Sequence, residues 1–226
     1  MYDYEYANLL QGYNNLRRFL LEEKPHIKEY NKIRKMHSEI INSMAKFYYN
    51  GKNTTVRIHN CNFNLNTQLG AQGLYDILIY KTVPDLSCIT EEFIQSNRYK
   101  KPEKIELLHS MLNTNIGLFE VTNTDIDEGY AYIKEIFTGK EYRIIDIGLS
   151  GQQNYSDIYL YTRIITHNGI SFGSGLNFVF KKTDDFIKNH IQYHKKNYTP
   201  DRELIRFMEL YNYLYNNPGK DRVVVT

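Results

Sequence analysis

The stretch DIYLYTRIITHNGISFGSGLNFVFK, residues 157–181, decides the fold. It holds two runs rich in Ile, Tyr, Phe and Val, from Asp157 to His167 and from Ile170 to Lys181. Such residues favour strands, and the second run alternates apolar with small or polar side chains, which is typical of a strand with one buried face. Asn168-Gly169 joins the runs, and Asn-Gly is the strongest short-range hairpin signal. The stretch therefore predicts two antiparallel strands, with Gly173 and Gly175 marking a bulge or a sharp bend.

Three more strand-like runs precede this hairpin, namely Ile116–Thr122, Gly129–Phe137 and Glu141–Gly148. Thr138-Gly139 lies between the last two, where a tight turn is needed. Five consecutive strands in about 65 residues predict an antiparallel meander or a small, partly closed barrel.

Helical periodicity flanks the strands on both sides. Apolar residues recur every three or four positions in three stripes: Leu9, Tyr13, Leu16 and Leu20; Ile33, Met36, Ile40, Met44 and Phe47; and Leu204, Phe207, Met208, Tyr211 and Leu214. Pro25 and Pro102 suit the first turns of two helices, and Thr183 and Thr199-Pro200 precede the last two.

The stretch between the second stripe and Pro102 is less regular. Residues 51–73 are rich in Asn, Thr, Gln and Gly, which indicates a loop with one short strand around Thr55–His59. Leu74–Tyr80 fits a buried strand or a short helix equally well. The sequence thus predicts an α+β fold, with N-terminal helices, the antiparallel β region and C-terminal helices. We divide it into a mainly helical region, 1–115, and a β region closed by two helices, 116–226, which could also form one single domain.

Composition excludes several classes of protein. Hydrophobic residues make up 42% and charged residues 24% of the 226 residues, so the chain can bury a sizeable core. A net charge of +2 does not imply a nucleic-acid partner. The sequence has neither a long apolar run nor a basic leader, so we expect no membrane association and a cytoplasmic location. Cys61 and Cys88 are too few for a disulfide framework, and we expect free thiols. Abundant Asn, Ile and Lys suggest a bacterial or phage origin.

His190 and His194 are the candidate metal ligands. They lie four residues apart on a predicted helix, a spacing that lets two imidazoles reach one ion. The metalloprotease pattern His-Glu-x-x-His is absent because Ile191 follows His190. A third ligand would come from His37, His59 or Asp157. The alternative is an ordinary basic helix face, since lysines flank both histidines: Lys188, Lys195 and Lys196.

His59 and Cys61 are weaker candidates for catalysis. On a strand, a spacing of two puts a thiol and a candidate base on the same face. Catalytic Cys and His residues are usually brought together by the fold, however, and the residues around Cys61 match no nucleophile motif.

Two basic runs, Arg98–Lys104 and Lys181–Lys196, contain interleaved tyrosines. Lys and Arg next to aromatic side chains can hold a nucleic-acid backbone and stack bases. Solvated helix ends explain the same pattern, so nucleic acid is a possible partner that we do not favour.

Residues 107–172 carry a pattern that resembles a known group of proteins. The residues of this pattern are Leu107, Leu108, Gly117 to Val121, Gly129, Thr138-Gly139, Tyr142, Asp146, Leu149-Ser150, Asp157 and Arg163. The pattern resembles a β-rich region of uncharacterised bacterial proteins, some of which carry a small Cys-rich metal-binding module. This chain lacks that module, and the resemblance transfers no functional residue.

The function that the sequence favours is that of a non-enzymatic binding or regulatory protein without a cofactor. It would act through protein–protein contacts or self-association, most simply as a dimer built on an uncovered helical stripe. The alternative is a metal-dependent or nucleic-acid-processing hydrolase that uses His190 and His194 to hold a divalent metal.

Overall fold

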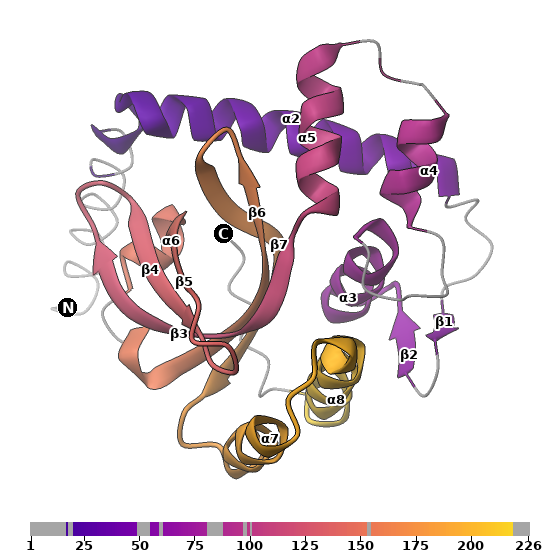
Figure 1. Cartoon of the computed structure of the whole chain (residues 1–226), viewed down its shortest axis with the longest axis vertical. Helices are drawn as coiled ribbons and strands as arrows, with labels where there is room; N and C mark the ends of the chain where they lie inside the picture. Colours follow the sequence, from indigo (N-terminus) through magenta and orange to yellow (C-terminus); the bar gives the residue numbers. More distant parts are fainter. Residues whose placement is uncertain are drawn as a thin grey trace, which may run out of the picture.

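The structure is a computed structural model, and it describes residues 17, 20–48, 55–58, 61–80, 88–96, 99, 101–152 and 155–218. Most of the first predicted stripe, from Leu9 to Leu16, lies outside these residues, as does His59. The α+β prediction is confirmed: helices precede and follow a five-stranded antiparallel sheet (Figure 1).

The five strands lie close to their predicted positions. They are β3 (Asn115–Asp125), β4 (Tyr130–Glu135), β5 (Glu141–Ile145), β6 (Ile158–His167) and β7 (Ile170–Lys181). Their order in the sheet is β5-β4-β3-β6-β7. A plain meander would pair β6 with β5, but the short helices α6 (Ile147–Ser150) and η1 (Tyr155–Asp157) return the chain to the other side of β3.

The sheet is strongly curved without closing into a barrel (Figure 1). Its edge strands β5 and β7 approach within 8 Å between Cα atoms, yet they share no ladder. The predicted turn between β6 and β7 is confirmed, since Asn168 and Gly169 have φ of 50° and 77°, as a type I′ turn requires. The register shifts opposite Arg163, where Gly175 adopts φ of 107°, so the predicted bulge is also present.

Helices pack around the sheet. They are α2 (Pro25–Tyr48), α3 (Gln68–Ile79), α4 (Ile89–Gln95), α5 (Pro102–Leu112), α7 (Asp185–Lys196), η2 (Pro200–Arg202) and α8 (Glu203–Asn216). A small hairpin of β1 (Thr55–Ile58) and β2 (Cys61–Asn64) lies beside α3. The sequence leaves Leu74–Tyr80 open between strand and helix; Leu74 to Ile79 form the second half of α3, and Tyr80 is its C-cap. This helix begins inside the predicted loop, where the Thr67 hydroxyl caps the Gly70 amide.

Three apolar clusters form the core. One lies between the sheet and α3, α7 and α8, a second joins α2, α4 and α5 to β6 and β7, and the third involves β3, β4, β5 and α6. The first two contain residues from both of the regions that the sequence separates at residue 115. None of the described helices combines the length and the hydropathy that crossing a bilayer requires.

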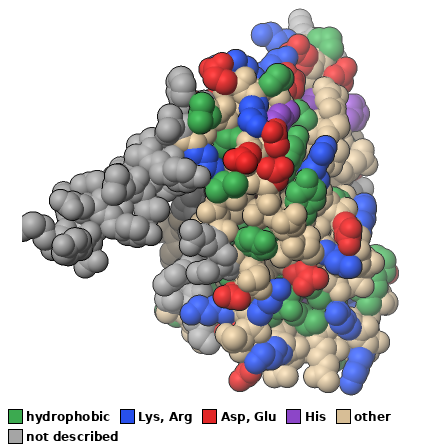
Figure 2. All heavy atoms as spheres, turned by 90° about the vertical axis from the view of Figure 1, so that its left-hand side faces the viewer, with side chains coloured by type: hydrophobic (Ala, Val, Ile, Leu, Met, Phe, Trp, Pro, Cys, Tyr) green, Lys and Arg blue, Asp and Glu red, His purple; other side chains and the backbone are tan. Residues whose placement is uncertain are grey.

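Most described residues of the stripes predicted on α2 and α8 are covered by the chain itself, and Met36, Leu204 and Met208 are half-buried. Ile33, Ile40 and Met44 of α2 and Phe207 and Tyr211 of α8 are all buried. An uncovered stripe on these two helices therefore cannot explain self-association, which stays a prediction. On the face shown in Figure 2, acidic and basic side chains are intermixed, without a continuous field of one sign among the described residues.

A buried ion pair fixes α3 to the sheet. Arg163 of β6 and Asp76 of α3 are 1% and 4% exposed, and the guanidinium reaches both carboxylate oxygens at 2.8–3.1 Å. Thr114 accepts a further hydrogen bond from Arg163, Ser174 donates one to Asp76, and the guanidinium lies over the Tyr80 ring. Each charge is thus compensated and hydrogen-bonded inside the fold.

Candidate metal centre

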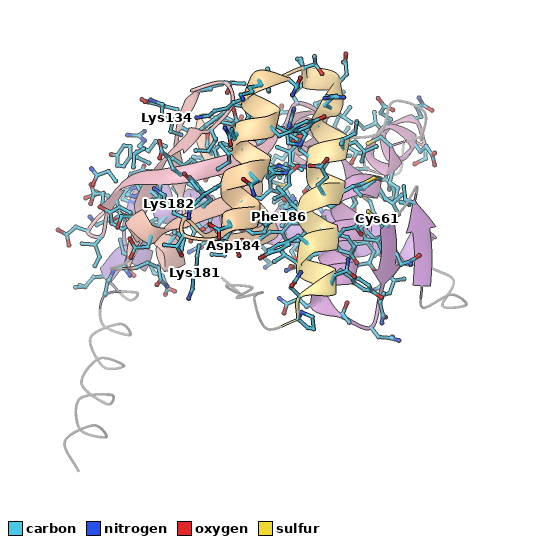
Figure 3. All side chains as sticks on the ribbon, turned by 90° about the horizontal axis from the view of Figure 1, so that it is seen from below. Cys61, Lys134, Lys181, Lys182, Asp184 and Phe186 are labelled. Carbon is cyan, nitrogen blue, oxygen red and sulfur yellow. The ribbon has the colours of Figure 1, made fainter. Side chains whose placement is uncertain are left out.

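The helices α7 and α8 lie side by side as an antiparallel pair over one face of the sheet (Figure 3). Arg206, almost fully buried, fixes the turn between them by donating to the Thr199 carbonyl at 3.2 Å and to the Glu203 carboxylate. Tyr161 of β6 donates to the other oxygen of Glu203 at 2.7 Å. The start of α8 is therefore anchored to the sheet by polar contacts.

The N-terminal end of α7 is tied to α8 separately. Asp184, and not Thr183, caps the helix by accepting a hydrogen bond from the Phe186 amide. The Tyr213 hydroxyl donates to the same carboxylate at 2.5 Å, and the Phe186 and Tyr213 rings stack with centroids 4.0 Å apart. Figure 3 labels Asp184 and Phe186 at this end of the pair.

Between these anchors, α7 presents His190 and His194 to Glu209 of α8. The histidines are 5% and 0% exposed, whereas the Glu209 side chain is 42% exposed. His194 Nε2 lies 2.7 Å from Glu209 Oε2 and is hydrogen-bonded to it. His190 Nδ1 lies 3.0 Å from the same oxygen without forming a regular hydrogen bond. One carboxylate oxygen thus faces two imidazoles.

Three buried nitrogen atoms of the cluster have no hydrogen-bond partner among the described residues: Nδ1 and Nε2 of His190 and Nδ1 of His194. Burial is the main cause that lowers the pKa of His190 to about 4; the neighbouring His194 lowers it too, and Glu209 acts in the opposite direction. His190 is therefore neutral at pH 7 and carries a lone pair, as a metal ligand must. Unpartnered polar atoms at such burial are costly unless something binds them.

The ligand atoms fit one small cation. One donor atom from each of His190, His194 and Glu209 lies within 4.8 Å of the other two. Zinc bonds of roughly 2.0–2.1 Å in tetrahedral geometry separate ligand atoms by about 3.4 Å. An ion therefore needs the carboxylate to move outward by roughly 0.5 Å from its present contacts, and the half-exposed Glu209 has room to do so. Two histidines and one glutamate are also a ligand set that zinc uses.

Apolar rings enclose the buried side of the cluster. Phe137, in the turn between β4 and β5, makes edge contacts with both imidazoles, with centroids 6.4 and 6.2 Å apart. Phe186 stacks on His190, and the Tyr193 ring meets His194 edge-on. Water can therefore approach from the Glu209 side, which is the open side of the site.

The sequence identifies the two histidines but not their carboxylate. His37 lies elsewhere, with Nε2 2.7 Å from the Tyr80 hydroxyl, and Asp157 lies in η1. His59 is outside the described residues. One feature of the sequence could have identified Glu209 as the third ligand. His190 lies nine residues before Thr199, and Glu209 lies nine residues after Pro200. An antiparallel pair of helices that turns there places the two residues opposite each other.

The Cys61 candidate has no catalytic setting. Its side chain is fully buried in the main core, its thiol points to the Met208 carbonyl at 3.8 Å, and burial raises its pKa. A nucleophilic cysteine needs a lowered pKa and access to substrate. Cys61 and Cys88 are both free, as predicted, and the structure shows that both are buried. The pairing with His59 falls outside the described residues.

The basic runs are partly neutralised by acidic neighbours. Lys104 pairs with Glu39 at 2.9 Å and Lys188 with Asp185 at 2.9 Å. Lys182 lies 3.6 Å from Glu120. Arg98 and Lys100 are outside the described residues. These pairs are typical of solvated helix ends.

Comparison with protein families gives a match over residues 24–223 to a family described as a family of unknown function, DUF7986. No curated protein and no solved structure matches the chain significantly. The match includes every strand of the sheet and the whole of α7 and α8, with the three residues of the candidate metal centre. Since it spans most of the chain, this protein belongs to the DUF7986 family.

Proposed function

We propose that this protein binds one zinc-type divalent cation through His190, His194 and Glu209. The observation that carries the proposal is a carboxylate oxygen placed between two buried imidazoles, one of which points an unpartnered nitrogen at it. A neutral imidazole can turn a nitrogen lone pair toward a cation, so an ion placed between these atoms can bind both rings and the carboxylate at once. Like the hydrolase hypothesis from the sequence, the proposal places a divalent metal on His190 and His194. The carboxylate ligand is Glu209 of α8.

The donor atoms favour zinc over magnesium or calcium. Two imidazoles with one carboxylate suit zinc and its neighbours among the transition metals, whereas magnesium and calcium prefer oxygen ligands throughout. His190, whose pKa is lowered to about 4, need not lose a proton at pH 7 before it binds.

Titration calorimetry with zinc on untagged, chelator-treated protein tests the proposal. We expect one zinc ion per chain and no heat of binding with magnesium. Glu209→Gln keeps the size of the side chain and removes its charge, so it should weaken zinc binding at least tenfold. His109→Ala is the matched control, because His109 is an exposed histidine on another helix, and it should bind zinc like the wild type. Wild-type protein that takes up no zinc would refute the proposal.

Metal-dependent hydrolysis is a second candidate, favoured by the number of ligands and by the exposure of Glu209. Catalytic zinc sites keep three protein ligands and leave the fourth position to water, whereas structural sites close with four. Zinc there would lower the pKa of a bound water and yield a nucleophile. Zinc-loaded protein should then hydrolyse nitrophenyl esters or phosphates, and Glu209→Gln should not. Equal background rates for the two proteins would reject hydrolysis of these substrates and leave metal binding intact.

A further inference from the structure

The helix α7 buries unusual side chains. Its buried residues are Ile187, His190 and His194, so two of the three are the imidazoles of the metal centre. By contrast, α8 buries Phe207, Leu210, Tyr211 and Leu214 together with Arg206. Burying an imidazole with unpartnered nitrogens gives little of the stabilisation that an aliphatic or aromatic side chain gives. Apolar burial alone therefore holds α7 far less firmly than α8.

The two halves of α7 also differ. The N-terminal half has its own anchors, namely the Tyr213 hydrogen bond to Asp184, the Phe186–Tyr213 stack and the buried Ile187. From His190 onward, the half-buried Ile191 packs against the core, and the other inward contacts are those of the two histidines with Glu209 and with surrounding rings. Lys195 and Lys196 at the end of the helix are exposed. The C-terminal half thus depends on the cluster that the ion would complete.

From this asymmetry we infer that zinc controls the docking of the C-terminal half of α7, residues 190–196, on α8. The inference rests on the proposed metal site and adds what the ion does there. With zinc, His190 and His194 join α7 to Glu209 through metal–ligand bonds. Without zinc, the same half opens from α8 while its N-terminal half stays attached at Asp184 and Phe186. The helix is then a metal-gated element with a fixed end and a released end.

Hydrogen exchange read by mass spectrometry, on the full chain with and without zinc, tests the inference. A ligand that binds only the docked form slows exchange through local opening by the factor by which it stabilises that form. Free zinc at ten times its dissociation constant should therefore slow exchange in residues 190–197 about tenfold. Peptides covering 184–189 and 207–214 should change less than twofold. The Asp184 and Phe186 contacts hold the first segment, and buried apolar side chains hold the second although Glu209 binds the ion.

Two variants separate the possible results. Tyr213→Phe removes the tie to Asp184, so exchange in residues 184–189 should rise while zinc still protects residues 190–197. Glu209→Gln should abolish the zinc effect without unfolding α8. If calorimetry shows that zinc binds and the exchange of residues 190–197 does not change, the gating is wrong and the metal site stands. If zinc does not bind at all, both are wrong.

Discussion

Two clusters with buried polar side chains in this protein differ in how completely the chain satisfies their hydrogen bonds. Around Asp76 and Arg163, both charges are paired, and Thr114 and Ser174 supply further hydrogen bonds. Around His190 and His194, one carboxylate oxygen faces two rings and is hydrogen-bonded to the His194 ring. Three nitrogen atoms have no hydrogen-bond partner among the described residues. The polar groups of the first cluster find their partners within the chain. The second cluster has unpartnered nitrogen atoms that a bound cation would satisfy.

The comparison shows why burial of charge alone does not indicate function. A buried ion pair with full hydrogen bonding is a structural joint, and here it fixes α3 to β6. Polar atoms left unpartnered at similar burial require another explanation, and a bound ion is the one that the donor atoms support. The following experiments test this distinction, from the largest expected effect to the smallest.

Arg163→Met should be the most damaging change, because it leaves the Asp76 carboxylate buried and unpaired. Removing one partner of a buried pair costs about 3–5 kcal/mol. Urea denaturation should show this fall in the free energy of unfolding, with or without zinc. The double variant Asp76→Leu with Arg163→Met should recover much of the loss, since both charges are then gone. A single variant as stable as the wild type would mean that the ion pair is not a structural joint.

Zinc should stabilise the wild type next most strongly. At 100 times its dissociation constant, an ion that binds only the folded state adds about 2.7 kcal/mol to the free energy of unfolding. Urea denaturation in zinc and in chelator measures the difference, which Glu209→Gln should lose and Arg163→Met should keep. If Glu209→Gln gains as much stability from zinc as the wild type does, the ion binds elsewhere.

His37 provides a pH test outside the metal centre. Burial, and to a smaller extent the Arg34 charge, lower its pKa to about 3, well below the ordinary value near 6.5. The unfolded chain therefore takes up the proton first, and the stability present above pH 6.5 is lost progressively as the pH falls toward 3. At pH 5 the loss from this group should be about 2 kcal/mol.

Chemical denaturation at pH 7 and at pH 5, in chelator, compares the wild type with His37→Gln. The wild type should lose more free energy of unfolding between these pH values than the variant does. Because the other histidines titrate in both proteins, the difference between the two losses isolates His37. Equal losses would mean that His37 titrates normally in the folded protein.

His190→Leu should have the smallest effect, and of opposite sign to Arg163→Met. Leucine fills a similar volume without unpartnered nitrogens, so the metal-free protein should gain about 1 kcal/mol of stability. Thermal denaturation in chelator should show a higher melting temperature, and calorimetry should show weakened zinc binding. A loss of stability in chelator would indicate that the imidazole is already satisfied without an ion.

The strands could be predicted because their signals are local. Asn168-Gly169, Thr138-Gly139 and alternating side chains set the strand limits within a few residues of the observed ones. The pairing of β6 with β3 could not be predicted from the sequence, because it depends on how α6 and η1 return the chain across the sheet. The start of α3 was missed because its first residues, Gln68 to Gly73, have little helical periodicity. The Thr67 cap marks this start in the structure.

The candidate metal centre also has a part that the sequence predicts and a part that depends on how the helices pack. His190 and His194 share one helix, so their spacing of four residues predicts that they face the same way. Glu209 joins them only when α7 and α8 pack as a pair, and it lies beside the apolar stripe of α8, not in it. The low pKa of His190 depends equally on packing, because burial against other elements is its largest cause.

The approach of β5 to β7 has a consequence for how this protein behaves in a crowded solution. An open sheet edge offers unpaired backbone groups that can recruit a strand from another chain and start aggregation. A strand inserted between two others needs about 9.5 Å between them, twice the spacing of neighbouring strands. Where β5 and β7 come within 8 Å, no foreign strand fits between them. The curvature of the sheet thus keeps strands of other chains from pairing with β5 and β7 where these two approach, without the hydrogen bonds of a closed barrel.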